Sequence, residues 1–373
     1  MASPAEVAEV GRRPDLAGGE VASAPKGRLE AFPDVAKVLA IVAVVTVHVT
    51  APASEDIHVI TNGAWLAAVA IETALRWCVP LFVMVSGMLL LRAGTAAESP
   101  SHFYRRRASR VAIPLVFWSL FYRAFLEYTG PHSTFLEHVQ ALYSGQPYFH
   151  LYFLYIIAGI YLICPFLARA IKDLSQPQLA GLTAGALTLG FLWTGVPPWL
   201  PATGSNAFSE FAPFIGYFLA GCWLARLELT RQVALAAAIV FAVLLPISTA
   251  VTYLWVSSGD LEYGRYLYWY LSPTVIVMSL CVFVVVRVAV REWTLRSPIR
   301  HMDRLHYVGE ATFGIFLIHP FFLGLWERTS AGRIPTVGHG FAWWIPLTVA
   351  GLIVVSFAVT VLLKQLPGLR RLV

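Results

Sequence analysis

The first long apolar run of the chain contains three side chains suited to acid–base chemistry. Asp34 and Lys37 stand at its start, and His48 lies deep inside it. His48 follows Lys37 by eleven residues, about three turns of α-helix, so the two side chains share one face with Asp34 close to it. The helical rise places His48 roughly 16 Å beyond Lys37, near the midplane of a bilayer with about 30 Å of hydrocarbon. An ionisable residue at that depth indicates a functional site.

Two interpretations of His48 follow from its chemistry. A neutral imidazole can accept a proton from a hydroxyl group and so serve as a general base. The alternative is a histidine that only hydrogen-bonds a neighbouring helix. Asp34 either pairs with Lys37 one turn away or reaches another helix.

A basic cluster lies where the third apolar run begins, within Phe103–Pro114. Arg107 and Arg110 are three residues apart and share a helix face. Guanidinium groups arranged in this way suit a ligand that carries phosphate. The alternative is that they anchor the chain to anionic lipid, the role we expect for Arg105 and Arg106.

Two further stretches combine histidine with unusual neighbours. His150, Tyr152 and Tyr155 open the fourth apolar run, either as an aromatic belt at the membrane surface or as a wall that binds a polyol acceptor. His319 precedes Pro320, a residue that frees the carbonyl four positions earlier and often kinks a helix. His319 either satisfies that broken backbone or lines the same cavity as His48.

The composition defines the class of protein. Of 373 residues, 58% are hydrophobic and 13% charged, whereas a soluble domain carries about 25% charged residues. Apolar runs of about 20 residues indicate helices, not a barrel. The net charge of +6 comes from basic residues whose positions fit membrane topology, so we expect no nucleic-acid partner. The four cysteines lie in apolar runs without metal-type spacing and are expected to be buried without a metal: Cys78, Cys164, Cys222 and Cys281.

We predict an all-α integral membrane protein with about ten spans and both termini in the cytosol, the side that would hold 22 of the 27 basic residues. Residues 1–30 form a disordered cytosolic tail, 31–366 a single membrane domain and 367–373 a short basic tail. Small residues at Ser86-Gly87 indicate close helix packing in the second span. The predicted spans are 35–53, 65–91, 111–128, 151–171, 178–196, 211–227, 233–256, 267–288, 309–326 and 342–364.

These stretches, in this order, resemble the membrane-bound acyltransferase-3 family, which includes polysaccharide and antibiotic O-acyltransferases. The resemblance covers about residues 31–330. It rests on Lys37 and His48, on Pro80-Leu-Phe-Val-Met-Val-Ser86-Gly87, on Arg107-Ala-Ser-Arg110 with Pro114, on His150-Leu-Tyr-Phe-Leu-Tyr155 and on Phe313-Gly-Ile-Phe-Leu-Ile-His319-Pro320.

The resemblance implies transfer of an acyl group, usually acetyl, from coenzyme A on the cytosolic side. Arg107 and Arg110, with Lys37 and Ser86, would bind the donor. His48, supported by Asp34 and Lys37, would deprotonate a hydroxyl of an envelope glycan or a secreted metabolite. The acceptor side would be formed by His150, Tyr152, Tyr155 and His319.

Other function classes fit part of the pattern. A multispan transporter or flippase of glycans or lipids also uses midplane ionisable residues and kinked helices. A membrane sensor would bind a ligand without turnover. The localisation we expect is a bacterial cell membrane, and the oligomeric state stays open, a homodimer included.

Overall fold

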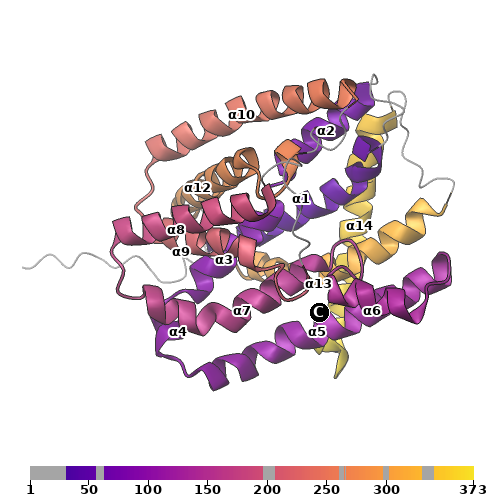
Figure 1. The fold of residues 1–373 in the computed structure, drawn as a ribbon, viewed down its shortest axis with the longest axis horizontal. Coiled ribbons are helices and arrows are strands. Elements are labelled where there is room, and N and C mark those ends of the chain that lie inside the picture. Colours follow the sequence, from indigo (N-terminus) through magenta and orange to yellow (C-terminus); the bar gives the residue numbers. More distant parts are fainter. Residues whose placement is uncertain are drawn as a thin grey trace, which may run out of the picture.

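The computed structural model describes residues 31–55, 63–195, 206–259, 264, 266–296, 302–329 and 340–373, and every regular element in these ranges is helical. Figure 1 shows α5, α7, α8 and α10 with nearly common axis directions. The helices are α1 (Ala31–Glu55), α2 (Gly63–Leu75), α3 (Cys78–Leu90), α4 (Ala93–Ala97), α5 (Pro100–Thr129), α6 (Phe135–Tyr143), α7 (Tyr152–Ile171), α8 (Gln176–Gly190), α9 (Ile215–Ala225), α10 (Arg231–Ser257), α12 (Pro273–Arg296), α13 (Met302–Glu327) and α14 (Gly340–Gln365).

Eight helical segments of the described residues are long and apolar enough to cross a membrane, α2 and α3 together forming one of them. This finding confirms the predicted class, an all-α integral membrane protein. Each of the ten predicted spans contains a helix, but the fifth and sixth correspond to the shorter α8 and to the apolar stretch Ala212–Ala225, and α12 begins six residues after the predicted start of the eighth. The cytosolic placement of both termini stays a prediction.

The second predicted span is broken at Arg76–Trp77, between α2 and α3. Arg76 forms an ion pair with Glu72, whose side chain is fully buried. A buried carboxylate without a partner is costly, so this pair keeps both charges within the bundle. Arg76 therefore pairs with a side chain inside the bundle.

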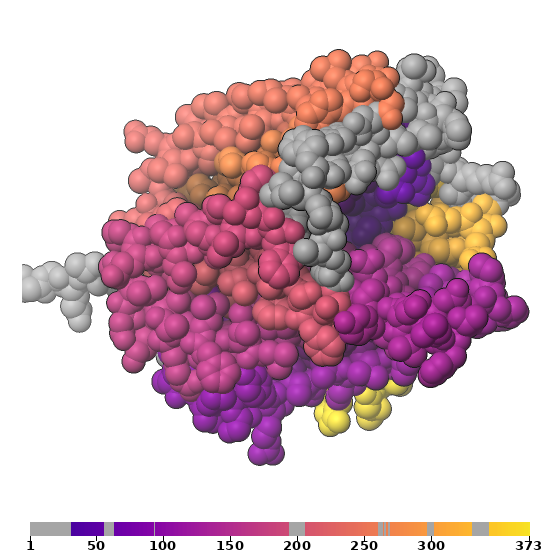
Figure 2. Space-filling model, viewed as in Figure 1, coloured from indigo at the N-terminus to yellow at the C-terminus, as the bar shows by residue number. Residues whose placement is uncertain are grey.

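Helix α1 lies at the centre of the bundle. It packs against α2, α3, α12, α13 and α14. Helix α10, by contrast, packs against α2 and α12 at the periphery, with only 6% of its most apolar window buried. Figure 2 shows α10 as a ridge along one edge of the molecule, with α5 and α6 on the opposite side. The exposed apolar face of α10 is therefore suited to contact with lipid.

Helices α3 and α9 meet through reciprocal glycines. A Cβ atom on Gly87 would lie 1.8 Å from the carbonyl oxygen of Phe218, and one on Gly221 would lie 1.8 Å from that of Met84. The two backbones therefore touch directly, which only small residues permit. The prediction of close helix packing at Ser86-Gly87 agrees with this contact.

The predicted C-terminal tail folds back onto the bundle. Residues Leu369–Arg371 form a 3-10 turn, and Trp118 of α5 donates a hydrogen bond from Nε1 to the carbonyl of Leu372 at 2.8 Å. The predicted N-terminal tail, residues 1–30, lies outside the described residues.

The α3–α9 contact predicts that Gly221→Ala destabilises the protein, because the methyl group has no space. Overpacking of this kind costs roughly 1–3 kcal/mol. A thermal unfolding curve of the purified protein in detergent should shift down by several degrees. Gly181→Ala in α8 is the matched control, since a Cβ there meets nothing within 4 Å; an equal shift in both variants would contradict the explanation.

Candidate active site

Helices α1 and α13 run side by side and are tied together at two levels. Asp34 Oδ2 lies 2.8 Å from His306 Nδ1, and His48 Nδ1 lies 2.9 Å from His319 Nε2. The two levels are fourteen residues apart in α1 and thirteen in α13. Nearly equal spacing in the same chain direction means that the helices are parallel and in register.

The first level is built around the carboxylate of Asp34. Besides His306, Lys37 Nζ contacts it at 2.9 Å. The carboxylate is buried against Gly309, where a Cβ atom would lie 2.6 Å from Oδ1. This cluster lies about 21 Å along α1 from His48, so Asp34 and Lys37 are not brought together with that histidine. In the structure, the Asp34 carboxylate helps to align α1 with α13.

The second level determines the tautomers of two histidines. His319 Nδ1 lies 2.9 Å from the carbonyl oxygen of Ile315, which can only accept, so Nδ1 of His319 carries a proton. Nε2 of the neutral His319 then accepts from Nδ1–H of His48. The proton of a neutral His48 is thereby held on Nδ1, and its Nε2 keeps a lone pair on the opposite side of the ring. This is the arrangement that a general base requires.

Pro320 explains part of this geometry. It removes the donor for the carbonyl of Phe316, and His319 bonds the carbonyl one residue earlier. His319 bonds the backbone of its own helix at Ile315, not at the carbonyl that Pro320 leaves free, and it contacts His48 without lining the cavity beside it.

A small cavity of about 10 Å³ lies beside His48, roughly the space that one water molecule needs. Most of its wall is apolar or aromatic, and His48 itself is half-buried. Tyr155, predicted on the acceptor side, is half-buried and does not line it. The lining residues are Val44, Val47, His48, Cys78, Val79, His150, Tyr152, Phe153, Tyr270 and Phe316.

His150 is the polar residue of this wall that lacks a partner. It is 1% exposed, and neither ring nitrogen has a hydrogen bond within the described part of the chain. Its ring centroid lies 6.0 Å from that of His319 and 4.9 Å from that of Tyr122. A buried polar group without a partner costs about 1–3 kcal/mol. Such a group is suited to bind an atom of the substrate.

Aromatic residues that the sequence analysis did not single out pack around His48 and His150 outside the cavity lining. Tyr122 donates to the carbonyl of Leu317 at 2.7 Å and stacks on Tyr148, with 4.4 Å between ring centroids. Burial raises the pKa of Tyr148 to about 12, so this phenol stays protonated and can donate. Phe149 contacts His48 edge to face at 4.8 Å. The sequence feature that could have identified Tyr148 and Phe149 as site residues is their position directly before His150.

The predicted donor residues lie on two other helices. Arg107 sits over the rings of Phe103 and Tyr161, at 5.8 and 5.7 Å, and its Nε is buried without a partner among the described residues. Arg110 is exposed. Ser86 Oγ donates to the carbonyl of Phe82 in its own helix at 2.9 Å. Arg107 is thus the more enclosed of the two predicted phosphate-binding arginines.

Residues 30–363 match the family model described as an acyltransferase domain, acyltransferase family 3. The chain belongs to this family. It is therefore a multi-pass membrane acyltransferase, an enzyme that needs an acyl donor and an acceptor. No curated protein and no solved structure matches the chain. Family membership favours the enzyme over the transporter, flippase and sensor interpretations.

The acyltransferase contains no cluster of three or more His, Cys, Asp or Glu side chains with metal-binding geometry within its described ranges. Two features stand out instead: the paired histidines with their oriented lone pair, and the unpartnered His150 beside them.

The tie between α1 and α13 predicts that Asp34→Ala lowers both stability and acyl transfer, since His306 and Lys37 lose their shared partner. The loss of these charged hydrogen bonds is worth about 1.5–3 kcal/mol. Thermal unfolding and a turnover assay on the same preparation would measure both effects. Asp303→Ala is the control, because Asp303 is exposed at the start of α13. If Asp303→Ala loses as much stability and activity as Asp34→Ala, the contact between α1 and α13 does not explain the loss.

Proposed function

We propose that this acyltransferase transfers an acyl group such as acetyl from coenzyme A to a hydroxyl of an envelope glycan or a secreted metabolite in a bacterial cell membrane. The observation that carries the proposal is the chain of hydrogen bonds from the Ile315 carbonyl through His319 to His48. It leaves the lone pair of His48 Nε2 available for a hydroxyl proton.

The reaction follows from this arrangement. His48 Nε2 takes the proton of the acceptor hydroxyl while the hydroxyl oxygen attacks the carbonyl carbon of the thioester. The oxyanion that forms needs a hydrogen-bond donor, and His150 has an unsatisfied N–H in the same wall. The C–S bond then breaks, the ester leaves with the acceptor, and the proton passes from His48 to the thiolate.

The two substrates would approach from opposite sides. The donor would come from the cytosolic side, where Arg107 has a buried Nε without a partner and Arg110 is exposed. The acceptor would meet the aromatic wall of Tyr122, Tyr148 and Tyr152. The cavity of about 10 Å³ is too small for either reacting group, so binding must widen it.

The proposal predicts that His48→Ala lowers acyl transfer by about 10²–10⁴-fold, the contribution of a general base. Mass spectrometry of envelope glycans and secreted metabolites, from cells with the wild-type protein, the variant or neither, would measure the acyl groups transferred. His132→Ala, a change at an exposed histidine, is the control. Wild-type acylation by a folded His48→Ala protein would remove His48 from the mechanism.

A second prediction separates orientation from packing. Glutamine at position 319 can donate its amide N–H to the Ile315 carbonyl and accept from His48 through its oxygen, whereas leucine can do neither. We expect His319→Gln to be more active than His319→Leu by roughly 10–100-fold, the usual cost of losing a group that orients an imidazole. Turnover at saturating donor measures this difference. Equal activities of the two variants would show that His319 contributes only to packing.

A further inference from the structure

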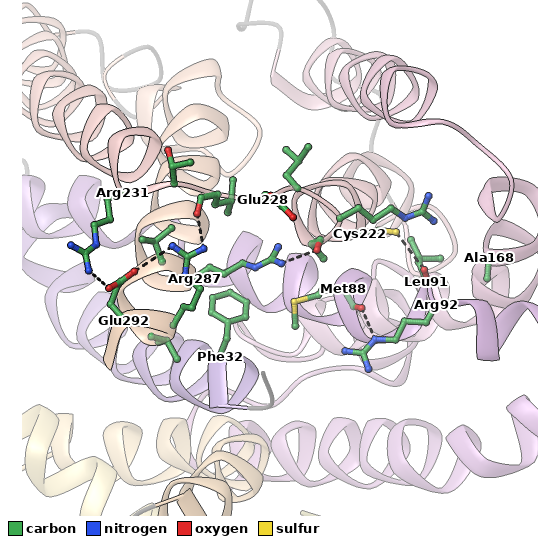
Figure 3. A pocket seen from close by; sticks show the side chains of 18 of the residues that line it. Phe32, Met88, Leu91, Arg92, Ala168, Cys222, Glu228, Arg231, Arg287 and Glu292 are labelled. Atoms are coloured by element: carbon green, nitrogen blue, oxygen red, sulfur yellow. Dashed lines mark hydrogen bonds and ion pairs between the residues drawn. The ribbon is translucent and has the colours of Figure 1, made fainter. Parts of the chain in front are cut away.

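A second, much larger cavity lies away from the paired histidines. It encloses about 1060 Å³, a size typical of sites for whole cofactors. Its walls are the start of α1, the ends of α3, α7 and α9, the link from α9 to α10, and the second half of α12 (Figure 3). Phe32 and Met88 supply an apolar floor between the charged groups.

The wall is strongly basic. Two carboxylates, Glu228 and Glu292, face six basic residues, which leaves a net charge of +4. All six belong to segments that the charge distribution places in the cytosol. They are Arg92, Lys172, Arg226, Arg231, Arg287 and Arg291.

Part of this charge is held in place by the backbone. Arg287 donates to the carbonyls of Leu224 and Ala225 at the end of α9, and Arg291 donates to that of Leu229 at 2.9 Å. Figure 3 shows the Arg287 side chain lying along the cavity, and both arginines line it. Guanidinium groups fixed in this manner lose little conformational entropy when they bind an anion.

Other cations of the wall are only loosely held. Arg226 makes one long hydrogen bond, 3.4 Å, to the carbonyl of Leu174, and Lys172 lies 3.6 Å from Asp173. Both side chains are exposed. They can turn toward a ligand in the cavity without breaking the packed core.

Helix α7 connects this cavity with the paired histidines. Phe153 lines the small cavity, Tyr161 contacts the Arg107 guanidinium, and Ala168 lines the large cavity. Spacings of eight and seven residues keep all three within about 80° around the helix axis, over a rise of roughly 22 Å. One side of α7 thus passes from the basic cavity, past Arg107, to His48.

We propose that the large cavity binds the 3′-phosphoadenosine end of the coenzyme A donor, with the diphosphate near Arg107 and the thioester beside His48. This inference rests on the proposed function and assigns the donor a site that Arg107 and Arg110 alone do not form. A phosphate group on an adenosine and one on a lipid headgroup offer the same chemistry to arginine, so the test must distinguish the two.

The test is a direct binding measurement on the full chain in phosphatidylcholine nanodiscs at one salt concentration. Coenzyme A and 3′-dephospho-coenzyme A are titrated against the wild type and against Lys172→Gln/Arg226→Gln. The wild type should bind coenzyme A more tightly than the dephospho form. In the double variant the Kd for coenzyme A should rise roughly tenfold, and the preference for the 3′-phosphate should be lost.

Arg105→Gln is the matched control, because Arg105 is an exposed arginine of α5 that does not line the cavity. It should bind both ligands as the wild type does. Melting temperatures of all three proteins establish that each is folded. Equal loss of affinity in Arg105→Gln would overturn the inference, because the loss would then come from the lower positive charge of the protein and not from the cavity.

The remaining outcomes are also decisive. If wild type and double variant bind coenzyme A equally, the cavity is not the donor site, and the proposed function stands without it. If the wild type does not bind coenzyme A at all, the proposed function itself fails. If phosphatidylglycerol raises the melting temperature of the wild type alone while coenzyme A affinity is equal in both, the cavity holds a lipid headgroup and the inference is overturned.

Discussion

The hydrogen bond between His48 and His319 is the interaction on which the candidate site depends. It joins two parallel helices, α1 and α13, inside the bundle, where a polar group without a partner is expensive. A shift of either helix by one residue would move one ring by about 1.5 Å and turn it by about 100°. The Asp34–His306 contact at the other end of the same pair opposes such a shift, and Gly309 provides the space that this contact needs.

The remaining architecture combines one rigid helix contact with a region in which side chains can move. Helices α3 and α9 touch backbone to backbone through Gly87 and Gly221, so they form a seam with no space to widen. On the other side, α5 and α7 hold aromatic rings and Arg107 between them, and the aromatic wall around His150 belongs to α5, α13 and the segment before α7. Side chains can change rotamer there without separating helices.

Much of the fold could be predicted from the sequence, because the hydropathy of a segment and its basic residues are evident from that segment alone. His48 and His319 were predicted to lie at similar positions within their own apolar runs, and their rings are in contact. Residues paired across the chain could not be predicted: His306 as partner of Asp34, Tyr270 beside His48, and the basic cavity made from the ends of several helices. The break at Arg76–Trp77 was also missed, since the apolar run continues through it without glycine or proline at those positions.

The order of the two histidines along the chain has a consequence for biosynthesis. His48 and His319 are 271 positions apart, on the first helix and on one of the last. At ordinary rates of translation, on the order of tens of seconds pass between their synthesis. During that interval the newly inserted α1 carries an imidazole whose final partner does not yet exist. The enzyme therefore acquires its reactive centre at the end of assembly, when α13 packs against a helix that entered the membrane first.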